Sequence, residues 1–583
     1  MLLAVPRIID MGNPRILLAC ILLVACGVSD DSASNGPRQE PTRTDLSTEF
    51  YAASSGMAYA TMAEGLTYLV VGVRGSGTLT ITFSIDGNEN LEREFSYGGG
   101  DTHTETVQLP GDGLRGVDFQ VKLTGNLSPL SCSLQSMLPE TTEADASLLG
   151  CLEGRNVIVF VEDSLAAKHL SAYGYERDTS PYLEQVAAAG VRFASAYSQT
   201  SWTLSSVTSL FTSLEQERHG VLMMNERLGD EFTTLAELFS NRGYRTVGLL
   251  QNGVLWSQTG LDRGFDEYKM YDGMLEGTQQ LLARARDLAL DDNPRPIFLY
   301  VHLTPPHQPY TPPGEFMTRY ADPDYAGEVD GSIISCATLN HQKPAEDSPD
   351  VQHLAALYDG HIRFIDERVG QLIKELKKAG CLDEFLIVKS SDHGEAFFEH
   401  GVQGHNSTVY EEMVRIPLVM HASGSPLPSG FVVDQPVSLM DLLPTLSDLF
   451  GLESSKQAIN GRSLLPYLQP KEQLATRPLY YTSRRRKGTD KLQAAVRMGR
   501  FKFVRRPVGS ELFDISADSD ERIDISNEHP VTAHALDSML KRWYTEAVAS
   551  GTKSAEVEID EQRLQAIQNL GYAGDIEDED EPR

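Results

Sequence analysis

The sequence predicts an α/β fold in which helices cover both faces of a mostly parallel sheet. We expect a β-sandwich before this domain and a smaller antiparallel subdomain after it. The main observation is NVIVFV (156–161), a continuous apolar run typical of a parallel strand buried on both faces. From residue 154 onward such runs alternate with helical patterns, whereas residues 46–140 contain only short runs, many of alternating polarity. Strand–helix alternation is the pattern of a parallel sheet between two helical layers.

The α/β domain is predicted over residues 154–475. SPYLEQVAAAGVRF (180–193) indicates a helix followed by a strand, and PIFLYVHL (296–303) and EFLIVKSS (384–391) indicate further buried strands. Ligands of such sheets bind beyond the carboxyl ends of the strands. The polar residues directly after these strands are therefore the candidate site.

The segments before and after the α/β domain have a different pattern of apolar and polar residues. Runs such as GTLTITFSID, separated by Gly, Asn and Asp turns, predict antiparallel strands over residues 46–140. This sandwich is either an inert structural module or a carbohydrate-binding one. Residues 476–576 predict a C-terminal α+β subdomain with a helix at about 531–549, and residues 577–583 form an acidic tail that we expect to be solvated.

The N-terminus predicts export. Arg15 precedes an uncharged apolar run, 16–25, which is too short to cross roughly 30 Å of hydrocarbon and indicates a signal peptide over residues 1–26. The run ends at Cys26 in a pattern that resembles the bacterial lipoprotein signal, in which the cysteine is acylated. The alternative is an ordinary cleaved signal with a chance cysteine. Residues 27–45 are small and polar, as a flexible tether should be. We therefore expect a lipoprotein of the bacterial cell envelope, anchored to a membrane and facing the periplasm or the exterior.

Charge and cysteine content indicate which partners and which disulfides the chain can have. The chain has 50 basic and 82 acidic side chains, and its net charge of −32 disfavours nucleic acid as a partner. A small anionic substrate then needs a metal or a local basic cluster. In an oxidising compartment the cysteines outside the signal are expected to form disulfides, for which Cys132–Cys151 with Cys336–Cys381 is one of three possible pairings.

Residues that could bind a metal or take part in catalysis lie at or just after the ends of three predicted strands. Asp163 follows the first strand and the pair Asp392-His393 follows a later one, while His302 lies near the end of a third and His307 comes soon after. Carboxylate and imidazole groups suit zinc, manganese, magnesium or calcium. Taken singly, each has a structural interpretation, since an Asp after a strand often caps a helix. The prediction of a metal site depends on their combination.

A helix with hydroxyl residues in its first turn begins near Thr203. The apolar residues after it recur with helical spacing from Val207 to Leu214. A helix N-terminus attracts anions, and a hydroxyl beside a divalent metal can act as a nucleophile. The structural alternative is ordinary N-capping by Ser or Thr.

Several long blocks resemble the sulfatase family of the alkaline-phosphatase-like superfamily. They occur in family order over residues 154–576 and include NVIVFVEDSLAAKHLSAYGYERDTSPYLEQVAAAGVRFASAYSQTSWTL, HLTPPHQPYTPP, SSDHGEAFFEHGVQGHNSTVYEEMVRIPLVMH and DEQRLQAIQNLGYAG. The resemblance implies a set of metal ligands and a nucleophile that also touches the metal: Asp163, Asp392 and His393 as ligands, with Thr203 as the nucleophile. It implies that His405 contacts the anionic group of the substrate and that His307 and His302 line the leaving-group side. Arg415 belongs to the same motif as His405, and an arginine there also has a purely structural interpretation.

The departures from the family pattern bear on the reaction. Formylglycine sulfatases begin their nucleophile motif with Cys or Ser and continue with Pro or Ala and then Arg, whereas this chain has Thr203-Leu204-Ser205-Ser206-Val207. Ser164 replaces the usual second aspartate. The set is similar to the single-metal site of threonine-dependent phosphoglycerol and phosphoethanolamine transferases, so we expect phosphoester or phosphodiester chemistry. The alternatives are a sulfuric ester hydrolase that does not use formylglycine and a catalytically silent envelope binding protein.

The expected partners follow from this interpretation. They are an anionic ester (a phospholipid headgroup, or a glycan phosphate or sulfate), a divalent metal (Mn, Zn, Mg or Ca), and the membrane that holds the lipid anchor. The basic run 484–487 is either a solvated hairpin tip or a clamp for an anionic group. Lys168 is either a substitute cation near the site or part of an exposed helix face.

Overall fold

The computed structural model describes strands between residues 48 and 137 and the chain from 146 to 572, apart from 454, 456, 470–476 and 484–491. The predicted signal 1–26 with Cys26, the tether 27–45, the basic run 484–487 and the acidic tail 577–583 lie outside the described residues. The chain divides into two compact units, Met1–Leu138 and Pro139–Arg583.

The described residues of the N-terminal unit form antiparallel strands, as the alternating pattern predicts. One sheet has the order β1-β7-β2-β5 and the other the order β4-β3-β6. The strands are β1 (Thr48–Phe50), β2 (Leu66–Arg74), β3 (Gly77–Ile85), β4 (Asn88–Tyr97), β5 (Thr102–Gln108), β6 (Val117–Gly125) and β7 (Ser128–Met137).

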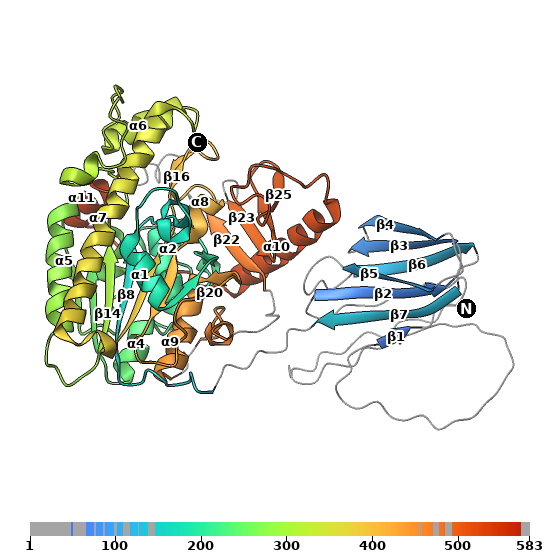
Figure 1. Ribbon diagram of the computed structural model, residues 1–583, viewed down its shortest axis with the longest axis horizontal. Helices are drawn as coiled ribbons and strands as arrows, with labels where there is room; N and C mark the ends of the chain where they lie inside the picture. Colours follow the sequence, from blue (N-terminus) through green and yellow to red (C-terminus); the bar gives the residue numbers. More distant parts are fainter. Residues whose placement is uncertain are drawn as a thin grey trace. The chain divides into compact units, whose positions relative to one another are not determined.

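An eight-stranded sheet organises the larger unit (Figure 1). Its order is β13-β12-β14-β8-β15-β19-β9-β20; the five strands from β13 to β15 run parallel, and β19 is antiparallel to both of its neighbours. The strands are β8 (Asn156–Glu162), β9 (Val191–Phe193), β12 (Arg245–Leu250), β13 (Glu267–Met270), β14 (Ile297–Leu303), β15 (Phe385–Ser391), β19 (Leu418–His421) and β20 (Phe431–Val433). The predicted mostly parallel sheet is thus confirmed.

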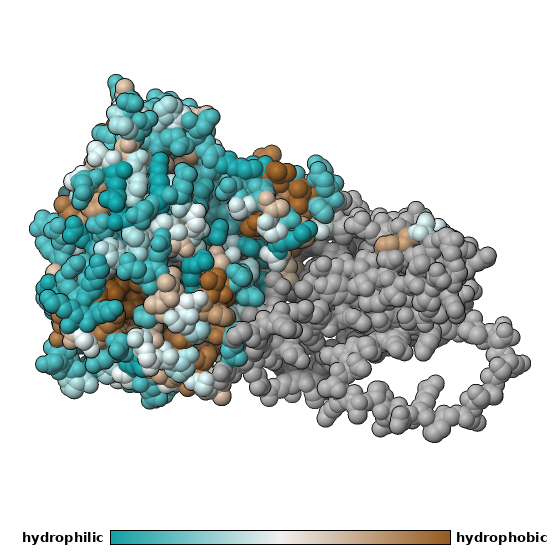
Figure 2. All heavy atoms as spheres, in the orientation of Figure 1, coloured by the Kyte–Doolittle hydropathy of each residue, from teal (hydrophilic) through white to brown (hydrophobic). Residues whose placement is uncertain are grey.

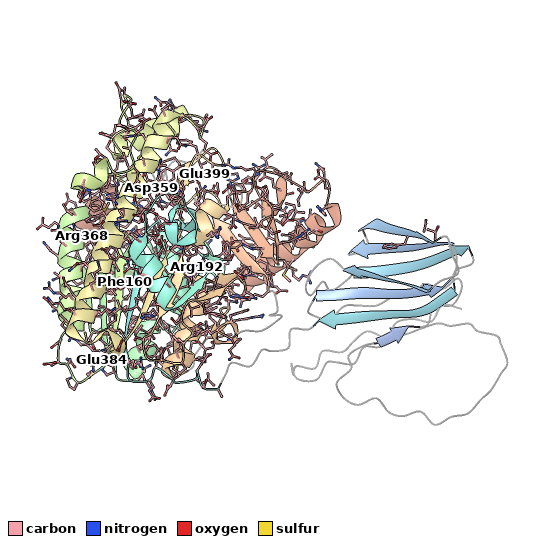
Figure 3. The ribbon with its side chains drawn as sticks, in the orientation of Figure 1. Phe160, Arg192, Asp359, Arg368, Glu384 and Glu399 are labelled. Atoms are coloured by element: carbon pink, nitrogen blue, oxygen red, sulfur yellow. The ribbon has the colours of Figure 1, made fainter. Side chains whose placement is uncertain are left out.

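The side chains of β8 explain why helices cover both faces of this sheet. Val157, Val159 and Val161 point into one apolar cluster, and Ile158 and Phe160 point into another. Phe160, labelled in Figure 3, is fully buried. Since successive side chains of a strand face opposite ways, an unbroken apolar run needs a cover on each face.

Two groups of helices supply these covers. α5 (Met274–Ala289) and α7 (Pro349–Ala379) contribute to the cluster of Ile158 and Phe160. α2 (Thr203–Thr212), α4 (Leu235–Asn241) and α9 (Leu442–Phe450) contribute to the opposite cluster. The remaining helices of this part are α1 (Pro181–Ala189), α3 (Gln216–His219), α6 (Ile333–Gln342) and α8 (Glu411–Val414). The predicted α/β fold is confirmed.

A second, antiparallel sheet follows, as predicted for the C-terminal part. It has the order β22-β23-β24-β25, formed by β22 (Leu479–Ser483), β23 (Gln493–Met498), β24 (Phe501–Arg505) and β25 (Ser510–Asp514). α10 (Pro530–Ser550) packs Leu536, Leu540 and Trp543 against one face of it.

The chain then returns to the large sheet through residues 552–572, which we call the C-terminal arm. Its strand β26 (Ala555–Glu556) pairs with β11 (Glu226–Arg227), and α11 (Glu561–Gln568) follows. Arg563 is fully buried and donates to the carbonyl of Met224 at 2.6 Å. Leu570 and Tyr572 belong to the same apolar cluster as α2. The arm therefore ends inside the α/β core.

The disulfide prediction is wrong for the cysteines that the structure describes. Cys151, Cys336 and Cys381 are free. Cys336 packs among residues beside the N-terminal half of α7, whereas Cys381 follows the C-terminus of that helix. Because α7 has 31 residues, about 45 Å of helix separates its two ends, which keeps these thiols far apart. The side chain of Cys132 lies outside the described residues.

The face of the larger unit that Figure 2 shows is mainly polar. Figure 2 shows a largely hydrophilic face over the described residues, with hydrophobic residues gathered in limited areas. The large exposed hydrophobic residues lie on separate elements, for example Leu275 on α5, Ile334 on α6 and Val548 on α10. Among the described helices, none has both the length and the apolar character needed to cross a membrane.

Candidate active site

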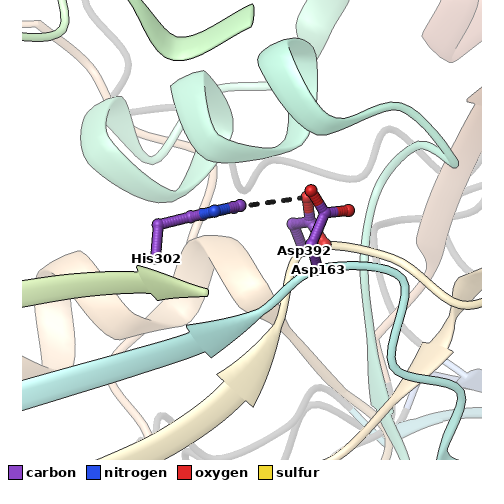
Figure 4. A group of neighbouring side chains, drawn as sticks. All are labelled: Asp163, His302 and Asp392. Atoms are coloured by element: carbon purple, nitrogen blue, oxygen red, sulfur yellow. Dashed lines mark ion pairs between the residues drawn. The ribbon is translucent and has the colours of Figure 1, made fainter. Parts of the chain in front are cut away.

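Two carboxylates and an imidazole meet at the carboxyl ends of three adjacent parallel strands (Figure 4). Asp163 follows β8, Asp392 follows β15, and His302 is the penultimate residue of β14. One ligand atom from each of the three lies within 4.8 Å of the other two. Nε2 of His302 lies 3.6 Å from Oδ2 of Asp392. His302, which the resemblance assigned to the leaving-group side, therefore lies beside the predicted metal ligands.

The predicted ligand His393 joins the same group. Its Nε2 lies 3.7 Å from Oδ1 of Asp163 and 3.7 Å from Oδ2 of Asp392. Its Nδ1 lies 2.9 Å from the carbonyl of Gly394, which can only accept, so Nδ1 carries the proton. The lone pair of Nε2 is thereby directed into the cluster.

Thr203 opens α2 and faces His393. Its Oγ1 lies 3.1 Å from Nε2 of His393. The N-cap residue is Trp202, and no side chain caps this helix in the described part of the chain, so the predicted alternative of hydroxyl N-capping does not apply. The neighbouring hydroxyls have other partners, since Ser205 donates to the carbonyl of Val221 and Ser206 to that of Asp392. Of these three hydroxyls, Thr203 is the one that contacts a side chain of the cluster, whereas Ser206 contacts only the backbone of Asp392.

The electrostatics of the cluster favour a bound cation. Burial and the charge of Asp392 raise the pKa of Asp163 to about 7. The pKa of Asp392 is lowered despite its burial, because His393 and His302 stabilise its charge. Asp392 Oδ2 and both ring nitrogens of His302 have no hydrogen-bond partner among the described residues. Two buried carboxylates, with oxygen and nitrogen atoms that lack hydrogen-bond partners and could bind a metal, fit a divalent cation.

Asn252 is a site residue that the sequence interpretation missed. It follows β12, and its Nδ2 donates to Oδ2 of Asp163 at 2.5 Å. The rule that identified Asp163 and Asp392, a polar residue just beyond a buried strand, would have found Asn252 if it had been applied to β12.

The other predicted catalytic residues form a second group beside Thr203. Nε2 of His307 and Nε2 of His405 each lie 2.8 Å from the hydroxyl of Tyr572. Nδ1 of His405 lies 3.0 Å from Oε1 of Glu395. The rings of His405 and His393 are 4.5 Å apart, which places this group next to the cluster. Burial lowers the pKa of both His307 and His405 to about 4, and it raises the pKa of Glu395 to about 7. Tyr572 lies in the block DEQRLQAIQNLGYAG, but the resemblance of that block to the family assigned the tyrosine no role.

The remaining candidates lie outside this group or have structural partners. Arg415 donates to the carbonyl of Ala194 at 3.0 Å, which supports the structural interpretation of that residue. Ser164, at the position of the missing second aspartate, donates to Asp163 at 3.2 Å. The ammonium group of Lys168 lies 2.8 Å from Glu399, which is labelled in Figure 3.

A cavity of about 710 Å³ adjoins the site. One wall comes from the strand ends, where Gln251 and Thr304 lie next to Asn252 and close to His302. The C-terminal arm forms another wall with Gln565, Asn569 and Leu570. The cavity therefore lies between the C-terminal arm and the strand ends that carry Asn252 and His302.

Comparison with known protein families yields two matches. A family described as Sulfatase matches residues 155–452, which is just over half of the chain. A second, described as N-sulphoglucosamine sulphohydrolase, C-terminal, matches residues 399–547.

Curated relatives and solved structures agree with these matches. The chain is 25% identical to an uncharacterized sulfatase (YidJ) of Escherichia coli (strain K12) over 360 residues, covering 54% of this chain and 71% of the relative. It is 29% identical to a choline-sulfatase of Rhizobium meliloti (strain 1021) over 297 residues, which is 47% of this chain and 56% of that protein. A phosphonate monoester hydrolase of Agrobacterium radiobacter matches in structure with a TM-score of 0.55 at 19% identity, covering 70% of this chain and 98% of the other. At that identity the structural match establishes the fold.

Proposed function

The chain belongs to the sulfatase family, and from this premise we propose that it is a metal-dependent enzyme that hydrolyses or transfers an anionic ester through a covalent intermediate on Thr203. The observation that carries the proposal is the 3.1 Å contact between Oγ1 of Thr203 and Nε2 of His393, beside two buried carboxylates. Retention of this group also argues against a silent binding protein, because binding alone does not require these residues together.

The residues that would hold the metal are Asp163, Asp392 and His393, with Thr203 at the same centre and His302 as a further donor. A divalent cation there would offset the two carboxylate charges and favour the alkoxide form of Thr203. Asn252 keeps one oxygen of Asp163 in place, while the Gly394 carbonyl fixes the ring of His393. Such outer contacts orient ligands before a substrate arrives.

Threonine restricts how the covalent intermediate can be released. Formylglycine hydrate has a second hydroxyl, and its sulfated form releases sulfate by elimination. Thr203 has a single hydroxyl, so its ester must be cleaved by attack at the phosphorus or sulfur atom of the bound group.

In the reaction that we favour, Oγ1 of Thr203 attacks phosphorus in line, and the bond from phosphorus to the leaving alcohol breaks while that alcohol takes up a proton. Water or an acceptor alcohol then attacks phosphorus, which releases the product and restores the hydroxyl of Thr203. His405 and His307 stabilise the charge of the transferred group.

Sulfate esters are the second candidate class. The relatives named choline-sulfatase and arylsulfatase support it, at 29% and 24% identity. The loss of the formylglycine motif opposes it, and for that reason we favour a phosphoester or phosphodiester. We also propose, from the sequence alone, that the enzyme is exported and anchored through Cys26, with a phospholipid headgroup or a modified glycan as the natural ester.

The test is turnover of aryl phosphodiesters, aryl phosphates and aryl sulfates by the metal-supplied protein. We expect phosphodiester cleavage that falls by at least about 1,000-fold in Thr203→Ala, because no nucleophile remains. Thr203→Ser should retain partial activity. Ser205→Ala is the matched control, since its hydroxyl lies in the same helical turn but bonds to Val221. Cleavage of sulfate alone would overturn the preferred ester class, and full activity in Thr203→Ala would exclude the covalent route.

A further inference from the structure

The C-terminal arm places a tyrosine hydroxyl between two imidazoles of the proposed active site. The hydroxyl of Tyr572 lies 2.8 Å from Nε2 of His307 and 2.8 Å from Nε2 of His405. Trp202, which directly precedes Thr203, packs against the ring of this tyrosine. Tyr572 lies 369 positions after Thr203 in the sequence, so the fold alone brings the two together.

These contacts use both nitrogens of each imidazole. Nδ1 of His307 lies 2.6 Å from the carbonyl of Gln308, which can only accept, so this nitrogen is the donor. Nε2 of neutral His307 then accepts the proton of Tyr572, and the oxygen of Tyr572 accepts the Nε2 proton of His405. Nδ1 of His405 faces Glu395 at 3.0 Å. Neither ring has a nitrogen left over for a substrate.

The hydroxyl also lies in a closed space. Tyr572 is 5% exposed, and Thr203 and His307 are not exposed at all. Trp202 packs edge to face against the ring of Tyr572, with centroids 5.1 Å apart. An ester cannot reach Oγ1 of Thr203 in this arrangement without moving a side chain.

We propose that Tyr572 is a further residue of the active site, whose hydroxyl occupies the subsite of the ester's anionic group and competes with the substrate for His307 and His405. This inference rests on the proposed function, in which these two histidines contact the transferred group. An anion entering the site replaces the hydroxyl oxygen as the acceptor of the Nε2 proton of His405. Nε2 of His307, which loses the hydroxyl proton, takes up a proton in order to donate to the anion, and the end of the arm withdraws. The cavity of about 710 Å³, which the arm lines with Gln565, Asn569 and Leu570, then becomes continuous with the site.

The attachment of the arm suggests how this displacement occurs. Gln308 Nε2 donates to the carbonyl of Leu570 at 3.2 Å and holds the arm two residues before Tyr572. Between them, Gly571 has a φ of +90°, and a Cβ there would lie 2.4 Å from Nε2 of Gln308. A glycine with left-handed backbone allows the sharp turn that directs the tyrosine inward. Besides the exchange of its two hydroxyl contacts, withdrawal of Tyr572 therefore needs the loss of the Gln308 hydrogen bond and of the backbone hydrogen bond from Tyr572 to the carbonyl of Ile567, with a local change at Gly571.

Equilibrium binding of inorganic phosphate and sulfate to the full chain tests the proposal without relying on turnover. Tyr572→Phe keeps the ring and removes the competing hydroxyl, so we expect it to bind anions about 5- to 10-fold more tightly than the wild type. Gln308→Ala loosens the arm without altering Tyr572 and should act in the same direction. Tyr244→Phe is the matched control: its hydroxyl is also buried but accepts from the backbone of Gly154. It should leave anion affinity unchanged.

The outcomes separate this inference from the proposed function. Equal or weaker anion binding by Tyr572→Phe would overturn it, because the hydroxyl would then be part of the anion site and not its occupant. If Tyr572→Phe binds anions more tightly but no ester is cleaved by any variant, the competition stands and the proposed chemistry fails. If esters are cleaved and Tyr572→Phe lowers kcat without lowering KM, the chemistry stands and the competition is excluded.

Discussion

The carboxamide of Asn252 donates to Oδ2 of Asp163 across 2.5 Å, which links the end of β12 to the end of β8 two strands away. Ser164 donates to the other oxygen of the same carboxylate at 3.2 Å. Asp163 is thereby held on both oxygens before any cation binds. A ligand that is already oriented loses less conformational entropy on binding, so the two neighbours should raise metal affinity.

We expect Asn252→Ala to lower metal affinity by about 10- to 100-fold, because Asp163 loses the donor that orients it. Isothermal titration of the metal-free protein measures the change directly. Asn156→Ala is a suitable control, since Asn156 accepts from the backbone of Ile297 at the opposite end of β8. An unchanged dissociation constant in Asn252→Ala would contradict the role of Asp163 as a ligand.

The two histidines of the cluster should differ when each is removed. His393→Ala should abolish metal retention and activity together, because it deletes both a ligand and the partner of Thr203. His302→Ala should weaken metal affinity by roughly tenfold but retain some turnover at saturating metal, since the contact of Thr203 with His393 survives. Metal analysis and ester turnover of the two variants, side by side, measure this. Wild-type metal affinity in His302→Ala, with a raised KM, would return that residue to the leaving-group role that the resemblance implied.

The sequence predicted those site residues that lie directly at the end of a strand or the start of a helix. Asp163, Asp392 and Thr203 were identifiable because buried strands end, and a helix begins, at recognisable places. His302 was assigned to the substrate, since its distance to Asp392 depends on the order of β14, β8 and β15 in the sheet. Tyr572 could not be placed, because no periodicity shows that a C-terminal arm will return to a helix more than 350 residues earlier. The cysteine pairing failed for a related reason, as α7 separates two thiols that are only 45 positions apart in the sequence.

Lys168 should prove structural and not catalytic. Its ammonium group bonds to Glu399 at 2.8 Å, and its side chain remains 31% exposed. We expect Lys168→Met to keep kcat/KM within about threefold of the wild type but to lower the free energy of unfolding by about 1–2 kcal/mol, since Glu399 loses its partner. Urea unfolding and ester turnover distinguish the two effects. Lys168→Arg should restore stability, and a large loss of turnover in Lys168→Met would favour the substitute-cation interpretation.

Acid should destabilise the protein through His219, which α3 packs against the helix that carries Thr203. The residue is fully buried; its Nδ1 accepts from the backbone of Val221, so Nε2 donates to Ser209. Burial lowers its pKa to about 3, from 6.5 in the unfolded chain. The unfolded chain therefore binds the proton first, and the stabilisation is complete above pH 6.5 and is lost as the pH falls towards 3. Between pH 6.5 and 4.5 the loss should reach roughly 2–3 kcal/mol.

His219→Gln can keep both hydrogen bonds without titrating, so its free energy of unfolding in urea should depend less steeply on pH than that of the wild type. The slope should not vanish, because His307 and His405 also have a lowered pKa of about 4. Identical slopes for the two proteins would show that His219 does not remain neutral in the folded state.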